Sequence, residues 1–429
     1  MTPQSSQGIG KFSSTTNFDV QGNIMSLLYG NNYKGQTDLT GKDYVFYRLF
    51  NNSRLVNAKS LSLPATTLAN GCYNCMFQGC TSLTTAPELP ATILTTNCYR
   101  YMFQGCTSLT VMPELLATTL ADYCYASMFS GCTSLITALE LPATTLVDYC
   151  YNQMFYSCTS LTTAPTLPAT ILADYCYDQM FYGCTNLTTA PVLPATTLAD
   201  YCYRQMFYGC TSLTVEPELP ATTLANYCYA YMFQGCTSLT TASQLPATTL
   251  TDYCYAGMFK NCRNLTTTPN LSAITLANYC CRYMFQGCTN LTTALELSAT
   301  ILAESCYESM FSGCTNLIMA PQLPTTTLAK SCYAYMFENC TSLTTAPELP
   351  ATTLASNCYR YMFNGCSSLN YIKAMFTTTP SGSSPYYYTQ NWVNGVSASG
   401  TFVKNSAAQW NVSGVYGIPS GWTVQTASE

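Results

Sequence analysis

The feature that most constrains this chain is a cysteine that returns every 26 residues. It occupies twelve positions from residue 72 to residue 358, and a second cysteine follows each of them eight residues later. The period runs from residue 72 to residue 366 without insertion or deletion. A fixed period of this length is typical of a solenoid, propeller or array, and the lack of linkers favours a solenoid whose repeats pack on their neighbours.

The first half of one repeat, residues 199–224, predicts a short outer helix. Asp200 is a candidate N-cap, because its side chain can accept hydrogen bonds from the first turn. Gly209 is a candidate left-handed residue just after the last turn. Between these two signals, the apolar side chains recur at helical spacing: Cys202, Tyr203, Met206 and Phe207.

The second half of the repeat predicts a short parallel strand. Residues 211–219 are rich in Thr and carry Leu near both ends, and Pro220 closes the segment. Residues 221–224 predict a turn or a second short strand. Stacked repeats would bury ladders of equivalent side chains, and the ladders we expect are those of Cys202, Met206, Phe207, Cys210 and Leu213.

The repeat resembles the BspA-type leucine-rich repeat. Met206-Phe207 and Cys210 correspond to the Ala-Phe-x-x-Cys segment of that family, and Leu213 and Leu219-Pro220 correspond to its strand. The unit here is slightly longer, which we expect to add about one helical turn. The resemblance implies an α/β solenoid, a curved leucine-rich-repeat superhelix of twelve 26-residue units, each with a short parallel strand and a short outer helix. It also implies a surface or adhesive role on a bacterium or a phage, and it names no ligand.

The two ends of the chain lack the cysteine columns and predict caps. Residues 1–63 predict an N-terminal cap with a degenerate first repeat, in which Ser53 lies near the place of a cysteine. Residues 64–372 predict the solenoid itself. Residues 373–429 hold all three Trp and predict either a C-terminal cap or a separate attachment module.

Composition excludes several classes of function. The chain has no His, which removes the usual general base and every His-containing zinc site. A net charge of −5 with only 8% charged residues gives no basic footprint for nucleic acid. No run approaches the roughly 18 apolar residues that span a bilayer, and the first residues show no signal peptide. We therefore expect no enzyme, no cofactor, no metal and no membrane span.

The cysteines allow two interpretations. The two cysteines of one repeat would lie roughly 10–12 Å apart along a helix, too far for a disulfide. Cysteines of one column in adjacent repeats would lie about 4.8 Å apart, which leaves disulfides open by distance, although parallel side chains fit them poorly. We favour buried reduced thiols, and expect alkylation to label all 26 only after denaturation. The lone Cys72-x-x-Cys75 has no second pair to complete a zinc site.

A column of tyrosines marks the predicted outer face. Tyrosine precedes the first cysteine in seven consecutive repeats, and this candidate ligand-binding surface is Tyr123, Tyr149, Tyr175, Tyr201, Tyr227, Tyr253 and Tyr279. A tyrosine ring has a flat apolar face and a polar tip, which suit sugars and protein partners. The alternative is a ladder that only seals the seams between repeats. The opposite face is a further alternative, because Thr214 and its equivalents are nearly uniform and would suit a periodic polysaccharide.

The sequence therefore predicts a non-enzymatic binding or adhesion protein. It would present an extended solenoid surface to a glycan or protein receptor, extracellularly on a bacterial surface or on a phage virion. The second hypothesis is a structural protein whose solenoids assemble into a fibre or virion component, which leaves a homo-oligomer open. Neither hypothesis involves nucleic acid.

Overall fold

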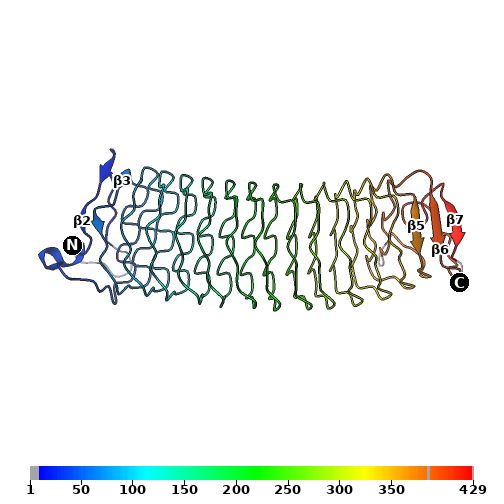
Figure 1. The fold of residues 1–429 in the computed structure, drawn as a ribbon, viewed down its shortest axis with the longest axis horizontal. Helices are drawn as coiled ribbons and strands as arrows, with labels where there is room; N and C mark the ends of the chain where they lie inside the picture. Colours follow the sequence, from blue (N-terminus) through cyan, green and yellow to red (C-terminus); the bar gives the residue numbers. More distant parts are fainter. Residues whose placement is uncertain (1–8, 384–386, 428–429) are drawn as a thin grey trace. The chain divides into compact units, whose positions relative to one another are not determined.

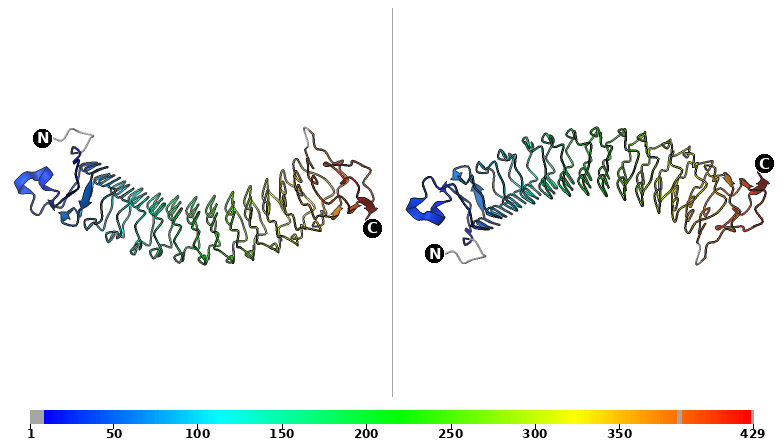
Figure 2. Two further views of the ribbon diagram at one scale, coloured as in Figure 1. Left: turned by 90° about the horizontal axis from the view of Figure 1, so that it is seen from above. Right: turned by 90° about the horizontal axis from the view of Figure 1, so that it is seen from below.

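The computed structural model describes residues 9–383 and 387–427. Contacts divide the chain into two compact parts, Met1–Glu218 and Leu219–Glu429. Within each part, successive repeats lie side by side in every view (Figures 1 and 2). The polypeptide therefore stacks on itself in the manner of a solenoid in both parts.

Regular secondary structure is confined to the two ends of the chain. The first part contains β1 (Phe18–Asp19), β2 (Gly22–Asn23), α1 (Ser26–Tyr29), η1 (Gly30–Asn32), β3 (Leu55–Asn57) and β4 (Leu61–Ser62). The second part contains β5 (Tyr371–Ala374), β6 (Thr401–Lys404) and β7 (Thr423–Thr426). All pairs are parallel: β1 with β3, β2 with β4, and β6 between β5 and β7.

The predicted outer helix is wrong, because a series of overlapping β-turns takes its place. In residues 122–132, which we call the turn segment together with its equivalents, the N–H groups of Cys124, Ala126 and Met128 donate to the carbonyl three residues earlier, at 3.1 to 3.2 Å. The alternate N–H groups donate to the next repeat: Tyr125 to Cys150 at 3.1 Å, Ser127 to Asn152 at 2.8 Å and Phe129 to Met154 at 2.9 Å. An α-helix would use all these donors within one repeat and leave none for the neighbour.

Left-handed residues at every fourth position prevent the helix. Tyr123, Ser127 and Gly131 have φ values of 58°, 54° and 75°, whereas a helical residue needs a negative φ. The resulting period is four residues, so the pairs at offsets 0, 1, 4 and 5 and the cysteine at offset 8 all point inward. In a helix of 3.6 residues per turn these offsets would also share one face, so the inward pattern alone does not distinguish the two conformations.

The predicted N-cap column bonds the neighbouring repeat instead. The Asp174 N–H donates to Asp148 Oδ1 at 3.1 Å, and the Asp200 N–H donates to Asp174 Oδ1 at 3.0 Å. In the second part, the Asn278 N–H donates to Asp252 Oδ1 at 2.9 Å. These carboxylates therefore link consecutive repeats by hydrogen bonds at the start of the turn segment.

The predicted strands are reduced to single parallel bridges. Thr137 pairs with Thr163 and Thr163 with Thr189, which gives a register of 26 residues. A second line of bridges pairs Thr145 with Ile171. We call residues 133–147 and their equivalents the bridge segment. These bridges support repeated short parallel strands as the basic element.

The expected ladders form the interior. Cys202, Met206, Phe207, Cys210 and Leu213 are all fully buried. Phe rings of consecutive repeats in the first part stack at 5.3 to 5.8 Å between centroids. Every one of the 26 cysteines is buried. The second cysteine of a repeat donates to a carbonyl of the preceding repeat, as Cys184 Sγ does to Phe155 O at 3.1 Å.

Both ends continue the ladder without cysteine. The N–H of Phe46 donates to Cys72 O at 2.9 Å, and the Oγ of Ser53 lies 3.4 Å from Cys80 Sγ. At the other end, the Phe363 N–H donates to Trp392 O at 2.8 Å, and the Trp392 side chain is fully buried. The predicted caps at 1–63 and 373–429 therefore contain turns like those of the repeats, while their boundaries stay predictions.

Candidate functional site

The tyrosine column forms close stacks on the outer side of the turn segments. In the first part, the ring centroids of consecutive tyrosines lie 4.4 to 4.5 Å apart along the row Tyr123, Tyr149, Tyr175 and Tyr201. In the second part, Tyr227, Tyr253 and Tyr279 stack at 4.4 and 4.6 Å. All seven side chains are half-buried. The left-handed backbone at this position, as at Tyr123, directs the side chain away from the core.

Stacking changes what these rings can offer a ligand. Each inner ring has both faces covered by its neighbours, so edges and hydroxyl groups remain accessible rather than flat faces. Partial burial, together with the neighbouring hydroxyls of Tyr123 and Tyr175, raises the pKa of Tyr149 to about 12. Tyr149 therefore presents a neutral hydroxyl at neutral pH, which both donates and accepts hydrogen bonds.

Further ladders lie beside this row on the same side of the first part. Tyr156, Tyr182 and Tyr208 stack at 4.7 and 4.4 Å. The Gln153 amide donates to Gln179 Oε1 at 3.0 Å. We call this surface of the turn segments the turn face. It combines aromatic edges, hydroxyls and side-chain amides, and the backbone beneath it is held by the inter-repeat hydrogen bonds.

Charged side chains on the turn face are paired where a partner lies one repeat away. Arg204 forms a two-pronged ion pair with Asp178, at 2.9 and 3.0 Å. The Asp178 side chain is only 3% exposed and also accepts a hydrogen bond from Asn152 at 3.0 Å. Burial raises the pKa of Asp178, against the opposing effect of the Arg204 charge. In the second part, Arg282 pairs with Glu308 at 2.9 Å.

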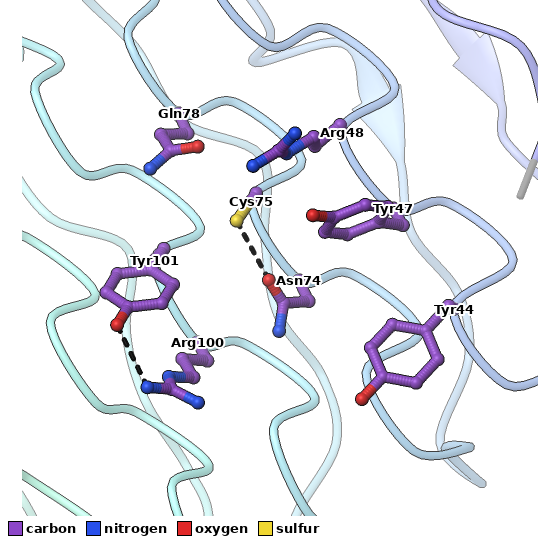
Figure 3. A pocket seen from close by; sticks show the side chains of 8 residues that line it. All are labelled: Tyr44, Tyr47, Arg48, Asn74, Cys75, Gln78, Arg100 and Tyr101. Carbon is purple, nitrogen blue, oxygen red and sulfur yellow. Dashed lines mark hydrogen bonds between the residues drawn. The ribbon is translucent and has the colours of Figure 1, made fainter. Parts of the chain in front are cut away.

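A pocket interrupts the turn face near the N-terminus (Figure 3). Its volume is about 480 Å³. The lining side chains come from three successive repeats: Tyr44, Tyr47, Arg48, Asn74, Cys75, Gln78, Arg100 and Tyr101. The Arg100 guanidinium donates to Tyr101 Oη at 2.9 Å, and the Cys75 thiol donates to Asn74 Oδ1 at 2.9 Å.

The opposite, threonine-rich side is the bridge face, formed by the bridge segments. Thr162, Thr188 and Thr214 are exposed. Their hydroxyls donate along the stack, Thr188 to Thr162 O and Thr214 to Thr188 O, both at 3.4 Å. Ile171 and Val215 lie on the same side and are 60% and 63% exposed. This face therefore presents oxygen acceptors and apolar groups, and the same segments also carry exposed carboxylates such as Glu140 and Glu218.

The pocket that contains Arg48 and Arg100 was not predicted from the sequence. A usable signal was present, because Arg204 and Arg282 each have an acidic residue 26 positions away, whereas Arg100 has Asn74 and Ala126 at those distances. Among residues 9–383 and 387–427, no cluster of three His, Cys, Asp or Glu side chains suited to a metal occurs.

Comparisons with known proteins agree with the repeat geometry. The family model described as a BspA type leucine rich repeat region of six copies matches residues 117–231, 166–292 and 281–400. A crystal structure of a leucine-rich repeat protein from Bacteroides ovatus has a similar fold, with a TM-score of 0.56 and 17% sequence identity. That similarity covers 89% of this chain and 86% of the other. No curated protein matches the sequence.

Proposed function

Because the chain belongs to the BspA-type leucine-rich repeat family, we propose that it is a non-enzymatic binding or adhesion protein whose turn face contacts a glycan or protein receptor. The family resemblance predicted from the repeat motif is confirmed. Leucine-rich repeat proteins of this kind are typically binding scaffolds, and no catalytic family matches the chain. We infer that the scaffold consists of the twelve 26-residue units between residues 64 and 372.

The observation that carries this proposal is the ordered row of tyrosine edges and hydroxyls. Tyr123, Tyr149 and Tyr175 are spaced by 4.4 and 4.5 Å and rest on a backbone whose alternate N–H groups bond the next repeat. A surface that is already rigid loses little conformational entropy on binding. Tyrosine also supplies both apolar area and a hydrogen-bonding group, which explains its enrichment in interfaces.

The proposed location is extracellular, on a bacterial surface or a phage virion. BspA-type repeat proteins are typically surface-associated in bacteria. Across the part of the chain that the structure describes, no helix has the length and apolarity needed to span a membrane. Fractionation of the native source, with detection in the particle or on the intact cell surface, would test this location.

The function is tested by removing hydroxyls without removing rings. The triple variant Tyr123→Phe, Tyr149→Phe and Tyr175→Phe keeps the aromatic stack, so it should fold normally. Each lost hydrogen bond is worth about 0.5–1.5 kcal/mol, so affinity for cells or for array-bound glycans should fall about tenfold or more.

The matched control changes the opposite side of the same repeats. The triple variant Thr162→Val, Thr188→Val and Thr214→Val removes three hydroxyls from the bridge face with little change in volume. It should bind as the unmodified protein does. Full affinity in the tyrosine variant together with weak binding by the threonine variant would assign binding to the bridge face and contradict the proposal.

The alternative is a structural protein that assembles through its solenoids into a fibre or virion component. The exposed Ile171 and Val215 on the bridge face favour it, because apolar rows can pack laterally. Sedimentation velocity over a hundredfold range of concentration distinguishes the two. Growth of large species that Ile171→Thr and Val215→Thr abolish would support assembly as the main role.

A further inference from the structure

We propose that the pocket lined by Arg48 and Arg100, here called the arginine pocket, binds the carboxylate of an acidic sugar residue. The inference rests on the proposed binding role and names one class of ligand for it. The experiments that test this inference use isolated sugars, so their result is independent of the result for the turn-face variants.

The pocket exists because one repeat carries small side chains between two repeats that carry large ones. Gly71 occupies the column that holds Tyr44 in the preceding repeat, and a Cβ at Gly71 would lie 2.3 Å from the Tyr44 ring. Asn74 and Cys75 likewise stand where the next repeat has Arg100 and Tyr101. The outer ladders are thus interrupted over a single repeat, and the larger neighbours form the walls.

The two arginines of the pocket lack the carboxylate partners that Arg204 and Arg282 have. Arg204 and Arg282 lie in the same column as Arg100, and both form ion pairs at 2.9 Å. Within residues 9–383 and 387–427, neither Arg48 nor Arg100 forms an ion pair, and Arg100 Nε is buried without a hydrogen-bond partner. The lining includes no acidic residue. Arg100 donates only to the neutral acceptors Asn97 Oδ1, at 3.2 Å, and Tyr101 Oη, at 2.9 Å. A guanidinium without an acidic partner retains N–H donors in the planar arrangement that a carboxylate matches.

The rest of the lining suits a sugar ring next to the carboxylate. The Asn74 side chain is buried, and its oxygen accepts the Cys75 thiol, so its amide N–H groups remain for a ligand in the described structure. The Tyr44 and Tyr47 rings meet edge to face, at 88° and 5.9 Å. In this arrangement the edge of one ring meets a face of the other, and the Arg48 guanidinium lies 5.0 Å from the centroid of the Tyr47 ring. Fewer ring faces are covered than in the tyrosine ladders, and an exposed aromatic face packs well on the C–H groups of a sugar. A single sugar residue is also compatible with a pocket of about 480 Å³.

The test measures binding of glucuronic acid to the full chain by titration calorimetry at low ionic strength. Glucose, which has a hydroxymethyl group where glucuronic acid has a carboxylate, is the control ligand. We expect glucuronic acid to bind at least about tenfold more tightly than glucose and to lose affinity as salt is added. Equal binding of the two sugars would overturn the proposal.

Three variants locate the site. The double variant Arg48→Gln and Arg100→Gln should weaken glucuronic acid binding at least about tenfold. Cys75→Tyr should abolish it by filling the pocket, and it should fold because the same column already holds Tyr101. The double variant Arg54→Gln and Arg263→Gln is the charge-matched control, since both residues are exposed and outside the pocket, and it should bind normally. Unchanged affinity in both pocket variants would overturn the assignment.

A peptide arm distinguishes the source of the carboxylate. A blocked tripeptide, acetyl-Gly-Glu-Gly-amide, carries a carboxylate without a sugar ring. Weaker binding of the peptide than of glucuronic acid supports the sugar. Equal or tighter binding of the peptide, lost in the double arginine variant, would overturn the sugar assignment in favour of an acidic protein segment. Neither result affects the turn-face proposal, which the tyrosine and threonine variants test separately.

Discussion

The turn segment and the bridge segment are neighbouring halves of one repeat, and they hold the chain in different ways. In residues 122–132, N–H groups alternate between a turn within the repeat and a carbonyl of the next repeat, at 2.7 to 3.2 Å. In residues 133–147, contact between repeats is reduced to bridges such as Thr137 with Thr163, and the Ile136 N–H reaches Thr110 O only at 3.5 Å.

Burial follows the same division. The turn segment supplies Cys124, Tyr125, Met128, Phe129 and Cys132 to the interior, all essentially inaccessible to solvent. The bridge segment supplies mainly leucines and leaves its threonines exposed. We therefore expect the turn segment to contribute most of the stability and most of the buried titratable side chains, and the bridge segment to tolerate substitutions. Four predictions test this difference, from the largest expected effect to the smallest.

Alkaline pH should unfold the protein through the turn segments. Burial raises the pKa of Cys124, Cys132 and Cys176 from 9.0 to about 12, and it raises the pKa of Tyr125 well above 10.0. Above pH 9 the unfolded chain loses these protons while the native state keeps them. The native state then binds more protons, so stability falls as pH rises, by about 1.4 kcal/mol per pH unit for each protected thiol.

Urea unfolding at pH 8, 9, 10 and 11 measures this effect. Stability should be fully present below pH 9 and should decline steeply up to pH 12. The bridge residues 133–147 contain no Cys or Tyr and cannot contribute. A midpoint that stays constant to pH 11 would show that the interior groups do not govern stability.

Truncation of an interior ring should cost far more than truncation in the bridge segment. Phe155 is fully buried and stacks between Phe129 and Phe181 at 5.8 and 5.6 Å. Phe155→Ala should lower the free energy of unfolding by about 3–5 kcal/mol. Thr163→Ala, in the following bridge segment, should change it by no more than about 0.5 kcal/mol. Equal losses in thermal denaturation would remove the distinction between the two segments.

Removal of the Arg204 charge should lower the free energy of unfolding, because the buried Asp178 carboxylate would lose its ion-pair partner. Arg204→Gln should destabilise the protein at pH 7 by about 2–3 kcal/mol, somewhat less than for a fully buried pair because Arg204 is half-exposed. Without the arginine, the native pKa of Asp178 rises further above its unfolded value. The deficit should therefore shrink as pH falls, because the native carboxyl becomes protonated first. A deficit independent of pH between 4 and 7 would indicate lost packing instead.

Glycine should have opposite effects in the two segments. Ser157 has a φ of 55° in a column otherwise dominated by Gly, so Ser157→Gly should relieve left-handed strain and stabilise by about 0.5–1 kcal/mol. Thr163→Gly should destabilise by a similar amount, because it adds only flexibility to an extended residue. Chemical denaturation of the two variants side by side measures the difference. Stabilisation by both substitutions would contradict the backbone assignment.

The interior could be predicted from the sequence, but the local conformation could not. The cysteine period located the buried columns, and Cys202, Met206, Phe207, Cys210 and Leu213 are all buried as expected. The helix prediction failed because offsets 0, 1, 4 and 5 fit a period of four as well as 3.6. Cys210 at offset 8 fits both periods too, so the spacing of the apolar residues could not decide between them. The tyrosine column was also visible in the sequence, whereas the stacking that covers the ring faces was not.

The sequence by itself determined the repeat length, the buried columns and the family, because each follows from which residue types recur every 26 positions. Tertiary structure decided the backbone conformation and the arginine pocket. A turn segment with left-handed residues is stable only when alternate N–H groups find carbonyls in the next repeat, and a single repeat contains no such partner. The pocket likewise depends on three repeats in contact, because Asn74 and Cys75 form a hollow only between larger neighbours.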